Sequence, residues 1–186
     1  MISRRYFLGA AGGVAATWLG VDRRELRQAL EDAAHGVSLD PPAPFRVLTA
    51  QAARDLDALT AQILPTDDLP GAREANVVRF IDQALAGFAG DRRVLIEQGL
   101  RDLAAEARRV YPQAQSFADL TVAQQIEMLR ALDASGSAFF EEVRQATLVG
   151  MFADPSYGGN AGKVGWKLLG FDDRFAWQPP FGDYDA

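Results

Sequence analysis

Few side chains in this sequence could do chemistry, and they do not form a recognisable catalytic set. The chain has one histidine, His35, and no cysteine. His35 lies beside a proline-rich stretch with no serine or cysteine in a nucleophile-like arrangement, which argues against a Ser-His-Asp system. One histidine and no cysteine also argue against a transition-metal site, iron–sulfur ligands and covalently attached haem. We therefore expect no catalytic residue and no bound metal in this chain.

The carboxylates do not single out a site either. Two aspartate pairs, at 67–68 and 172–173, could contribute to calcium binding, but neither has the rest of a calcium-loop pattern. Both pairs are interpreted as solvated turns. Glu141 and Glu142 are adjacent and point to different faces of a helix, so they cannot act together on one substrate. No spacing identifies the facing pair of acids that a glycosidase needs.

The run Gly158-Gly159-Asn160 is the nearest approach to a phosphate-binding loop. It lacks a preceding strand, the G-x-G-x-x-G spacing and a Walker-type lysine. A tight turn with left-handed backbone is the preferred interpretation, because glycine and asparagine tolerate that conformation, and Asn160 could also cap a following helix. We therefore expect no FAD or NAD bound by this chain.

The N-terminus has the layout of a twin-arginine export signal, carried by Ser3, Arg4, Arg5, Phe7 and Leu8. A weakly apolar run follows to about residue 21, and it is too poor in strongly apolar residues to span a bilayer. Such a leader is an address read by the twin-arginine translocase, so we expect a periplasmic protein. The alternative is an N-terminus in which the arginine pair arose by chance. Whether the leader is cleaved or stays as a weak membrane anchor is open.

Charge is unevenly distributed along the 186 residues, whose net charge is −6. Residues 1–30 contain five arginines against Asp22 and Glu25, a balance of +3, so the remaining chain carries −9. An acidic body argues against nucleic acid as a partner. The hydrophobic content of 48% is that of a globular domain.

Helical periodicity predicts an all-α fold, an irregular bundle of about five to six helices with a long, loop-rich, aromatic C-terminal segment. Thr49 should cap the first helix, Asp91 the third, and Thr121 with Gln124 should form a capping box at the fourth. The second helix is expected from about Ala72 to Phe88. The predicted divisions are a signal segment (1–21), a short helix with a proline-rich linker (22–45) and the helical domain with its tail (46–186).

The expected core of the later helices follows from their apolar faces. In the third helix it comprises Val94, Leu95, Leu100, Leu103, Ala107 and Val110. In the fourth helix it comprises Ile126, Leu129 and Leu132. The aromatic tail could fold back on this bundle or bind a partner, and the sequence leaves both possibilities open.

Three segments resemble the gluconate 2-dehydrogenase subunit 3 family, and the resemblance extends over about residues 46–178. They are P-T-D-D-L-P-G-A at 65–72, D-P-S-Y-G-G-N at 154–160 and G-W-K-L-L-G-F at 165–171. The second segment followed by the third is the most specific part. A twin-arginine leader is usual in that family.

The resemblance implies a small, cofactor-free subunit of a bacterial membrane-bound sugar or sugar-acid dehydrogenase. FAD is then expected on a large partner subunit, a flavoprotein of the glucose–methanol–choline oxidoreductase type, and a multihaem cytochrome c could complete the complex. The small subunit would accompany the flavoprotein through the twin-arginine pathway and stabilise it. The substrate of that dehydrogenase stays open.

A partner-binding surface is hypothesised at the most specific segment and in the aromatic tail, where glycines would allow close backbone approach and aromatic side chains would fill pockets. Its residues are Asp154, Pro155, Tyr157, Gly158, Gly159, Asn160, Trp166, Phe171, Trp177 and Phe181. Two alternatives remain from the residues alone: an autonomous periplasmic carboxylate-dependent hydrolase, and a stand-alone binding module.

Overall fold

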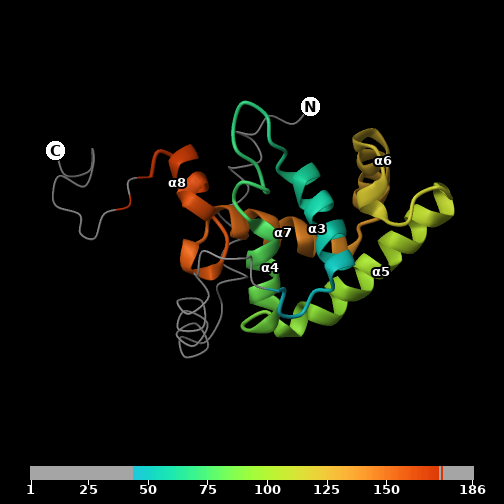
Figure 1. Ribbon diagram of the computed structural model, residues 1–186, viewed down its shortest axis with the longest axis horizontal. Coiled ribbons are helices and arrows are strands. Elements are labelled where there is room, and N and C mark those ends of the chain that lie inside the picture. The colour runs from blue at the N-terminus through green and yellow to red at the C-terminus, as the bar shows by residue number, and fades with distance from the viewer. Residues whose placement is uncertain (1–43, 172, 174–186) are drawn as a thin grey trace.

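The structure, a computed structural model, describes residues 44–171 and residue 173. In this part the chain forms an irregular all-α bundle without strands, which confirms the predicted fold class (Figure 1). The export signal, His35 and the proline-rich linker lie outside the described residues. The α-helices are α3 (Ala50–Ile63), α4 (Val77–Ala86), α5 (Arg93–Val110), α6 (Val122–Ala134), α7 (Ala138–Phe152) and α8 (Val164–Leu168). Four 3-10 helices connect them, η1 (Gly90–Arg92), η2 (Phe117–Asp119), η3 (Pro155–Tyr157) and η4 (Ala161–Lys163).

Helix α3 is the centre of the bundle and contacts α4, α5, α6 and α7. It begins as predicted at Thr49, whose Oγ1 accepts a hydrogen bond from the Ala52 N–H at 3.1 Å. Its inner face is completely buried at Leu56 and Leu59. Helices α6 and α8 lie at opposite ends of the long axis of the molecule (Figure 1).

The second helix is shorter than predicted and begins at Val77 rather than Ala72. The preceding residue, Asn76, has left-handed backbone with φ of 56°. A residue in that conformation cannot continue an α-helix, so residues 72–76 form turns instead. Phe88 also lies beyond the end of the helix, where it packs half-buried against the core.

The predicted core of helix α5 is confirmed at Leu100, Leu103 and Ala107 and is wrong at Val94, Leu95 and Val110. Val94, 75% exposed, and the exposed Leu95 and Val110 lie outside the core, while Ile96 is completely buried. The buried series from Ile96 follows the helical repeat through Leu100, Leu103 and Ala107, and Val94 lies about 200° around the axis from Ile96. Asp91 does not cap the helix, because η1 precedes it and Arg92 occupies the cap position.

The capping box at the start of α6 is confirmed. The Gln124 side chain accepts from the Thr121 N–H at 3.0 Å, and Thr121 Oγ1 accepts from the Gln124 N–H at 3.4 Å. The predicted core residues Ile126 and Leu132 are only half-buried, and Gln125 is buried in their place. Its Nε2 donates to the carbonyl oxygens of η2 and of the residue that follows it, which explains how an amide is accommodated there.

Two buried carboxylates hold loops against the bundle. Asp82 accepts backbone N–H bonds from Arg46, Val47 and Leu48 at 2.6, 3.0 and 3.0 Å. Asp55 accepts from the Ala118 N–H at 2.8 Å and thereby fixes η2 against α3. Across the described residues, no helix has the length and apolar character needed to cross a membrane.

Candidate partner-binding surface

The segment after α7 folds back onto that helix and carries most of the residues hypothesised to bind a partner. Asp154 begins the return, and its Oδ1 accepts from the Ser156 N–H at 2.9 Å. The Tyr157 ring meets Phe88 edge to face, with centroids 6.1 Å apart. Burial, and to a smaller extent the charge of Asp154, raise the pKa of Tyr157. The hydroxyl of this half-buried tyrosine therefore stays neutral at physiological pH.

The Gly158-Gly159-Asn160 run is the tight turn that the sequence predicts. Gly158 and Asn160 have left-handed backbone, with φ of 90° and 46°. Asn160 is completely buried: its Nδ2 donates to the Ala153 carbonyl at 2.9 Å, and its Oδ1 accepts from the Gly165 N–H at 2.8 Å. One asparagine side chain thus joins the end of α7 to the start of α8.

Gly159 lies directly against the backbone of α7. A Cβ at this position would lie 2.3 Å from the carbonyl oxygen of Gly150. The close backbone approach expected of these glycines is therefore an approach to the chain's own helix. Because Gly159 and Asn160 are buried inside the subunit, neither offers a side chain or backbone surface to another protein.

The other hypothesised residues divide into two groups. Within the described part of the chain, the exposed or half-exposed ones are Asp154, Pro155, Tyr157, Gly158, Trp166 and Phe171. Trp177 and Phe181 lie outside the described residues. The structure thus leaves a smaller candidate surface, centred on α8.

An apolar corner forms at the end of α8, and we call Trp166, Leu169 and Phe171 the α8 corner. Trp166 Nε1 donates to the Phe152 carbonyl at 2.8 Å, which fixes the indole on the end of α7. The Phe171 ring contacts it edge to face at 5.2 Å. Leu169 and Phe171 are nevertheless 54% and 48% exposed. The corner is therefore positioned by internal bonds and still offers apolar surface.

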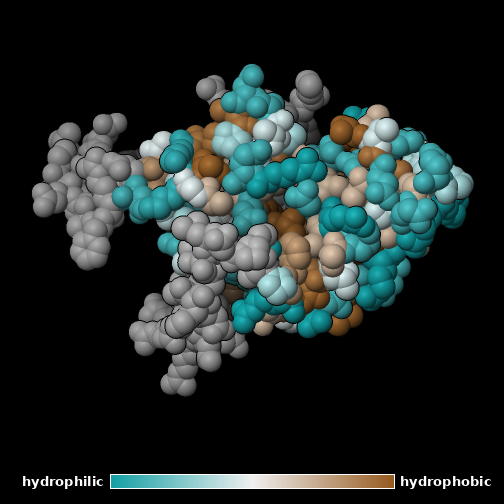
Figure 2. Space-filling view, viewed as in Figure 1, coloured by the Kyte–Doolittle hydropathy of each residue, from teal (hydrophilic) through white to brown (hydrophobic). Residues whose placement is uncertain are grey.

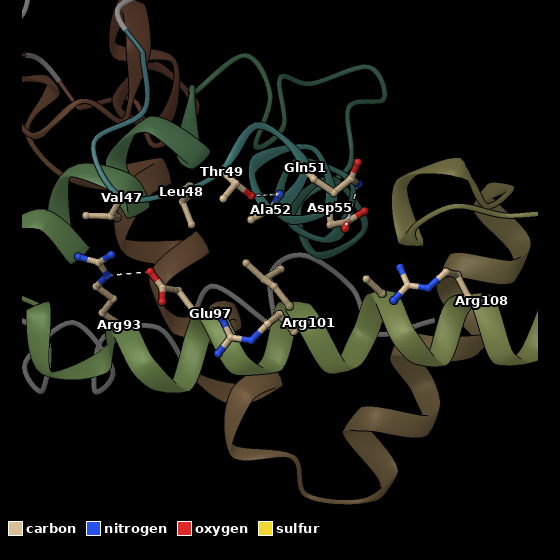
Figure 3. A pocket seen from close by; sticks show the side chains of 12 residues that line it. Val47, Leu48, Thr49, Gln51, Ala52, Asp55, Arg93, Glu97, Arg101 and Arg108 are labelled. Atoms are coloured by element: carbon tan, nitrogen blue, oxygen red, sulfur yellow. Dashed lines mark hydrogen bonds and ion pairs between the residues drawn. The ribbon is translucent and has the colours of Figure 1, made fainter.

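A groove of about 620 Å³ lies between α3 and α5 and was not predicted from the sequence. Figure 3 shows Arg93, Arg101 and Arg108 along the α5 side of this groove, opposite Thr49 and Asp55. Arg93 pairs with Glu97 at 2.7 Å, whereas Arg101 and Arg108 bond to an amide oxygen and a backbone carbonyl. Their spacing of eight and seven residues could have indicated a shared helix face.

The acidic residues considered for catalysis do not converge. Glu141 binds Arg144 and Gln145, whereas Glu142 forms an ion pair with Arg92 at 2.9 Å, so the two adjacent acids have separate partners. Among residues 44–171 and 173, no group of three His, Cys, Asp or Glu side chains is placed to hold a metal ion.

On the face shown in Figure 2, apolar residues emerge in several separate patches among hydrophilic ones.

The P-T-D-D-L-P-G-A loop is closed by Glu74. This carboxylate accepts from Thr66 Oγ1 at 2.7 Å and from the Gly71 N–H at 2.8 Å. The bond from Thr66, followed by that from Gly71, lowers the pKa of Glu74. The loop is therefore held best when this carboxylate is ionised.

We expect Glu74→Gln to lower the free energy of unfolding slightly at neutral pH, where Glu74 is ionised, and to have little effect in acid, where Glu74 is protonated. A carboxyl whose pKa is lowered by folding contributes stability above its unfolded pKa and loses it as the pH falls through the folded value. The difference in unfolding free energy between variant and wild type should therefore shrink between pH 5 and pH 3 in urea titrations. The exposed Asp68→Asn is the control, and a pH-independent difference for Glu74→Gln would contradict the prediction.

The comparisons with known proteins point to one family. Residues 50–173 match the model of the family described as gluconate 2-dehydrogenase subunit 3. No curated protein and no solved structure matches the chain in the corresponding searches. The matched range begins with α3, ends beyond α8 and includes all three segments on which the resemblance was based. Because the match extends over more than half of the chain, this protein belongs to the gluconate 2-dehydrogenase subunit 3 family.

Proposed function

We propose that this chain is a non-catalytic subunit of a gluconate 2-dehydrogenase-like complex, in which it binds and stabilises a large flavoprotein of the glucose–methanol–choline type. FAD belongs to that large subunit, and a multihaem cytochrome c can complete the complex. The twin-arginine signal of this chain carries both subunits to the periplasm as a folded pair. Family membership and the N-terminal sequence support this proposal.

The observation that carries the proposal is the α8 corner. A subunit with no partner has no evident reason to fix a tryptophan with a hydrogen bond and an aromatic contact while leaving the adjacent Leu169 and Phe171 half exposed. Large, rigidly held aromatic side chains are the usual anchors of protein interfaces. The corner also lies within the range that matches the family model.

The role proposed for this chain is therefore to present a rigid apolar surface that binds the flavoprotein. The turn at Gly158 and the buried Asn160 set the position of α8 on α7. The α8 corner then inserts into an apolar recess of the flavoprotein. Removal of such an anchor weakens binding by roughly 2 kcal/mol, or about 30-fold in affinity.

The experiment is co-expression of this chain with the proposed large flavoprotein subunit. We expect FAD-containing, active flavoprotein in the periplasm only when this chain is present. The double variant Leu169→Asp/Phe171→Asp should abolish most of that periplasmic activity and the co-purification of the two chains.

The control is Val122→Asp, which places a negative charge on an apolar side chain that is 60% exposed at the start of α6. It should leave co-purification unchanged. Active flavoprotein in the periplasm without this chain would refute the proposed role. Equal effects of the α8 and α6 variants would refute the assignment of the surface.

A further inference from the structure

A second groove lies at the other end of the molecule, between the C-terminal half of α5, α6 and the start of α7. It has a volume of about 550 Å³. Its floor is apolar and includes the buried side chains of Leu103, Met128 and Phe139. Gly99 also lines the groove. The Phe139 ring packs directly against Gly99 and occupies the space that a Cβ at position 99 would need. Apolar side chains can therefore pack on the floor of this groove.

The charged residues of this groove are all acidic. Asp102, Glu106 and Glu127 line it, and its lining contains no arginine, lysine or histidine. Of these three carboxylates, only Glu106 forms an ion pair within the described part of the chain, with Arg109 at 2.6 Å. Asp102 and Glu127 accept only from neutral donors, Gln98 Nε2 at 2.8 Å and the Tyr111 hydroxyl at 3.0 Å. An apolar floor bordered by three carboxylates favours a segment that is both apolar and basic.

The chain itself supplies such a segment at its N-terminus. Residues 1–30 carry +3 on an otherwise acidic protein, and the adjacent Arg4 and Arg5 directly precede Tyr6, Phe7 and Leu8. The 22 residues from 22 to 43 can extend over roughly 70 Å. A domain of this size is only about 35 to 40 Å across, so the segment can reach any part of the surface.

We propose that this acidic groove binds residues 1–21 of the same chain. The side chains of Phe7 and Leu8 lie on the apolar floor, and Arg4 and Arg5 pair with the groove carboxylates. Binding within one chain benefits from an effective concentration near the millimolar range, so even a weak contact is populated. The arginine pair is then covered while the segment is bound, and its exposure depends on displacement from the groove. This inference uses only charge and shape, so it stands or fails independently of the proposed partnership with a flavoprotein.

Disulfide trapping in the full-length chain tests this proposal, because the natural sequence contains no cysteine. The protein is produced in a host without the twin-arginine translocase, so that the leader is retained. The test pair is Ala10→Cys/Ala131→Cys, in which the exposed Ala131 lines the groove. The control pair is Ala10→Cys/Ala86→Cys, whose second position is exposed at the end of α4. Mild oxidation should link the test pair within one chain at least ten times faster than the control pair.

Charge variants separate specific binding from random collision. Asp102→Asn/Glu106→Gln/Glu127→Gln in the background of the test pair should slow cross-linking several-fold, as should 0.5 M NaCl. The control triple Asp68→Asn/Asp91→Asn/Asp133→Asn removes the same charge from exposed acids outside the groove and should not slow it. Circular dichroism checks that each variant is folded. Equal rates for the two cysteine pairs, or indifference to the groove charges, would overturn the proposal. Predominant disulfide-linked dimers would also overturn it and would identify a second copy as the occupant.

Discussion

Gly159→Ala should destabilise the protein by about 3 kcal/mol, although it adds a single methyl group. The new Cβ would lie 2.3 Å from the Gly150 carbonyl oxygen and 3.0 Å from the Cβ of Phe80. The oxygen belongs to the backbone of α7 and cannot rotate away, so the turn must separate from the helix. Overpacking of this kind costs about 1–3 kcal/mol and sometimes more. Urea or thermal unfolding followed by circular dichroism measures the loss.

The matched control is Gly90→Ala, because a Cβ there would lie 3.7 Å from its nearest neighbour, an ordinary contact. It should change stability by no more than about 0.5 kcal/mol. If Gly159→Ala is as stable as Gly90→Ala, the turn does not pack on α7 as described. Because displacement of the turn also moves α8, Gly159→Ala should reduce binding to the proposed flavoprotein partner, although Gly159 is not part of the proposed surface.

The helical architecture could be predicted from the sequence because its signals are local. Thr49 and the Thr121–Gln124 pair are capping residues whose effect depends on the next three residues, and both predictions are confirmed. The left-handed conformations of Gly158 and Asn160 likewise follow from their residue types. Such features are decided within one turn of the chain and need no knowledge of the tertiary packing.

The predictions of core residues that were wrong have different causes in α5 and in α6. Val94 and Leu95 are apolar, yet they fall outside the face that α5 presents to the core, and the helical repeat that joins Ile96 to Leu100, Leu103 and Ala107 was the local signal that distinguishes them. Gln125 is buried because its Nε2 donates to carbonyls just before α6 and its Oε1 accepts from Gln62 Nε2 of α3, which is 63 residues away in the chain. An amide is accommodated in a core only when another segment satisfies it, which a single helix pattern does not reveal.

The candidate site could be located but not fully interpreted from sequence. The D-P-S-Y-G-G-N segment, predicted to be part of the partner-binding surface, lies just before the α8 corner in the chain. Its two most buried members, Gly159 and Asn160, bind the chain's own α7 and α8 instead of facing outward. A motif can be specific to a family because it builds the local fold, and the exposed residues beside it then provide the surface. The two grooves on α5 were missed because the first combines residues of two separate segments and the second residues of three.

Asp82→Ala should have the largest effect of any single polar substitution in the described part of the chain. The carboxylate is buried and accepts N–H bonds from three consecutive residues, Arg46, Val47 and Leu48. Each buried donor left without a partner costs about 1–3 kcal/mol. Because water can reach part of the cavity left by the side chain, we expect a total loss of about 4 kcal/mol. For a protein of this length that loss lowers the Tm by roughly 10 °C.

The three N–H groups belong to residues 46–48, which directly precede the cap residue Thr49 of α3. Loss of these bonds should therefore also detach this segment from the bundle. Hydrogen exchange of the Val47 and Leu48 amides would then rise toward that of solvent-exposed amides, while those in α7 remain protected. Asp82→Asn keeps one carbonyl oxygen as an acceptor and should lose only part of the stability. Asp133→Ala removes an exposed aspartate of α6 and should stay within about 0.5 kcal/mol of the wild type. Equal stability of Asp82→Ala and Asp133→Ala would mean that the Asp82 carboxylate does not hold residues 46–48 in place.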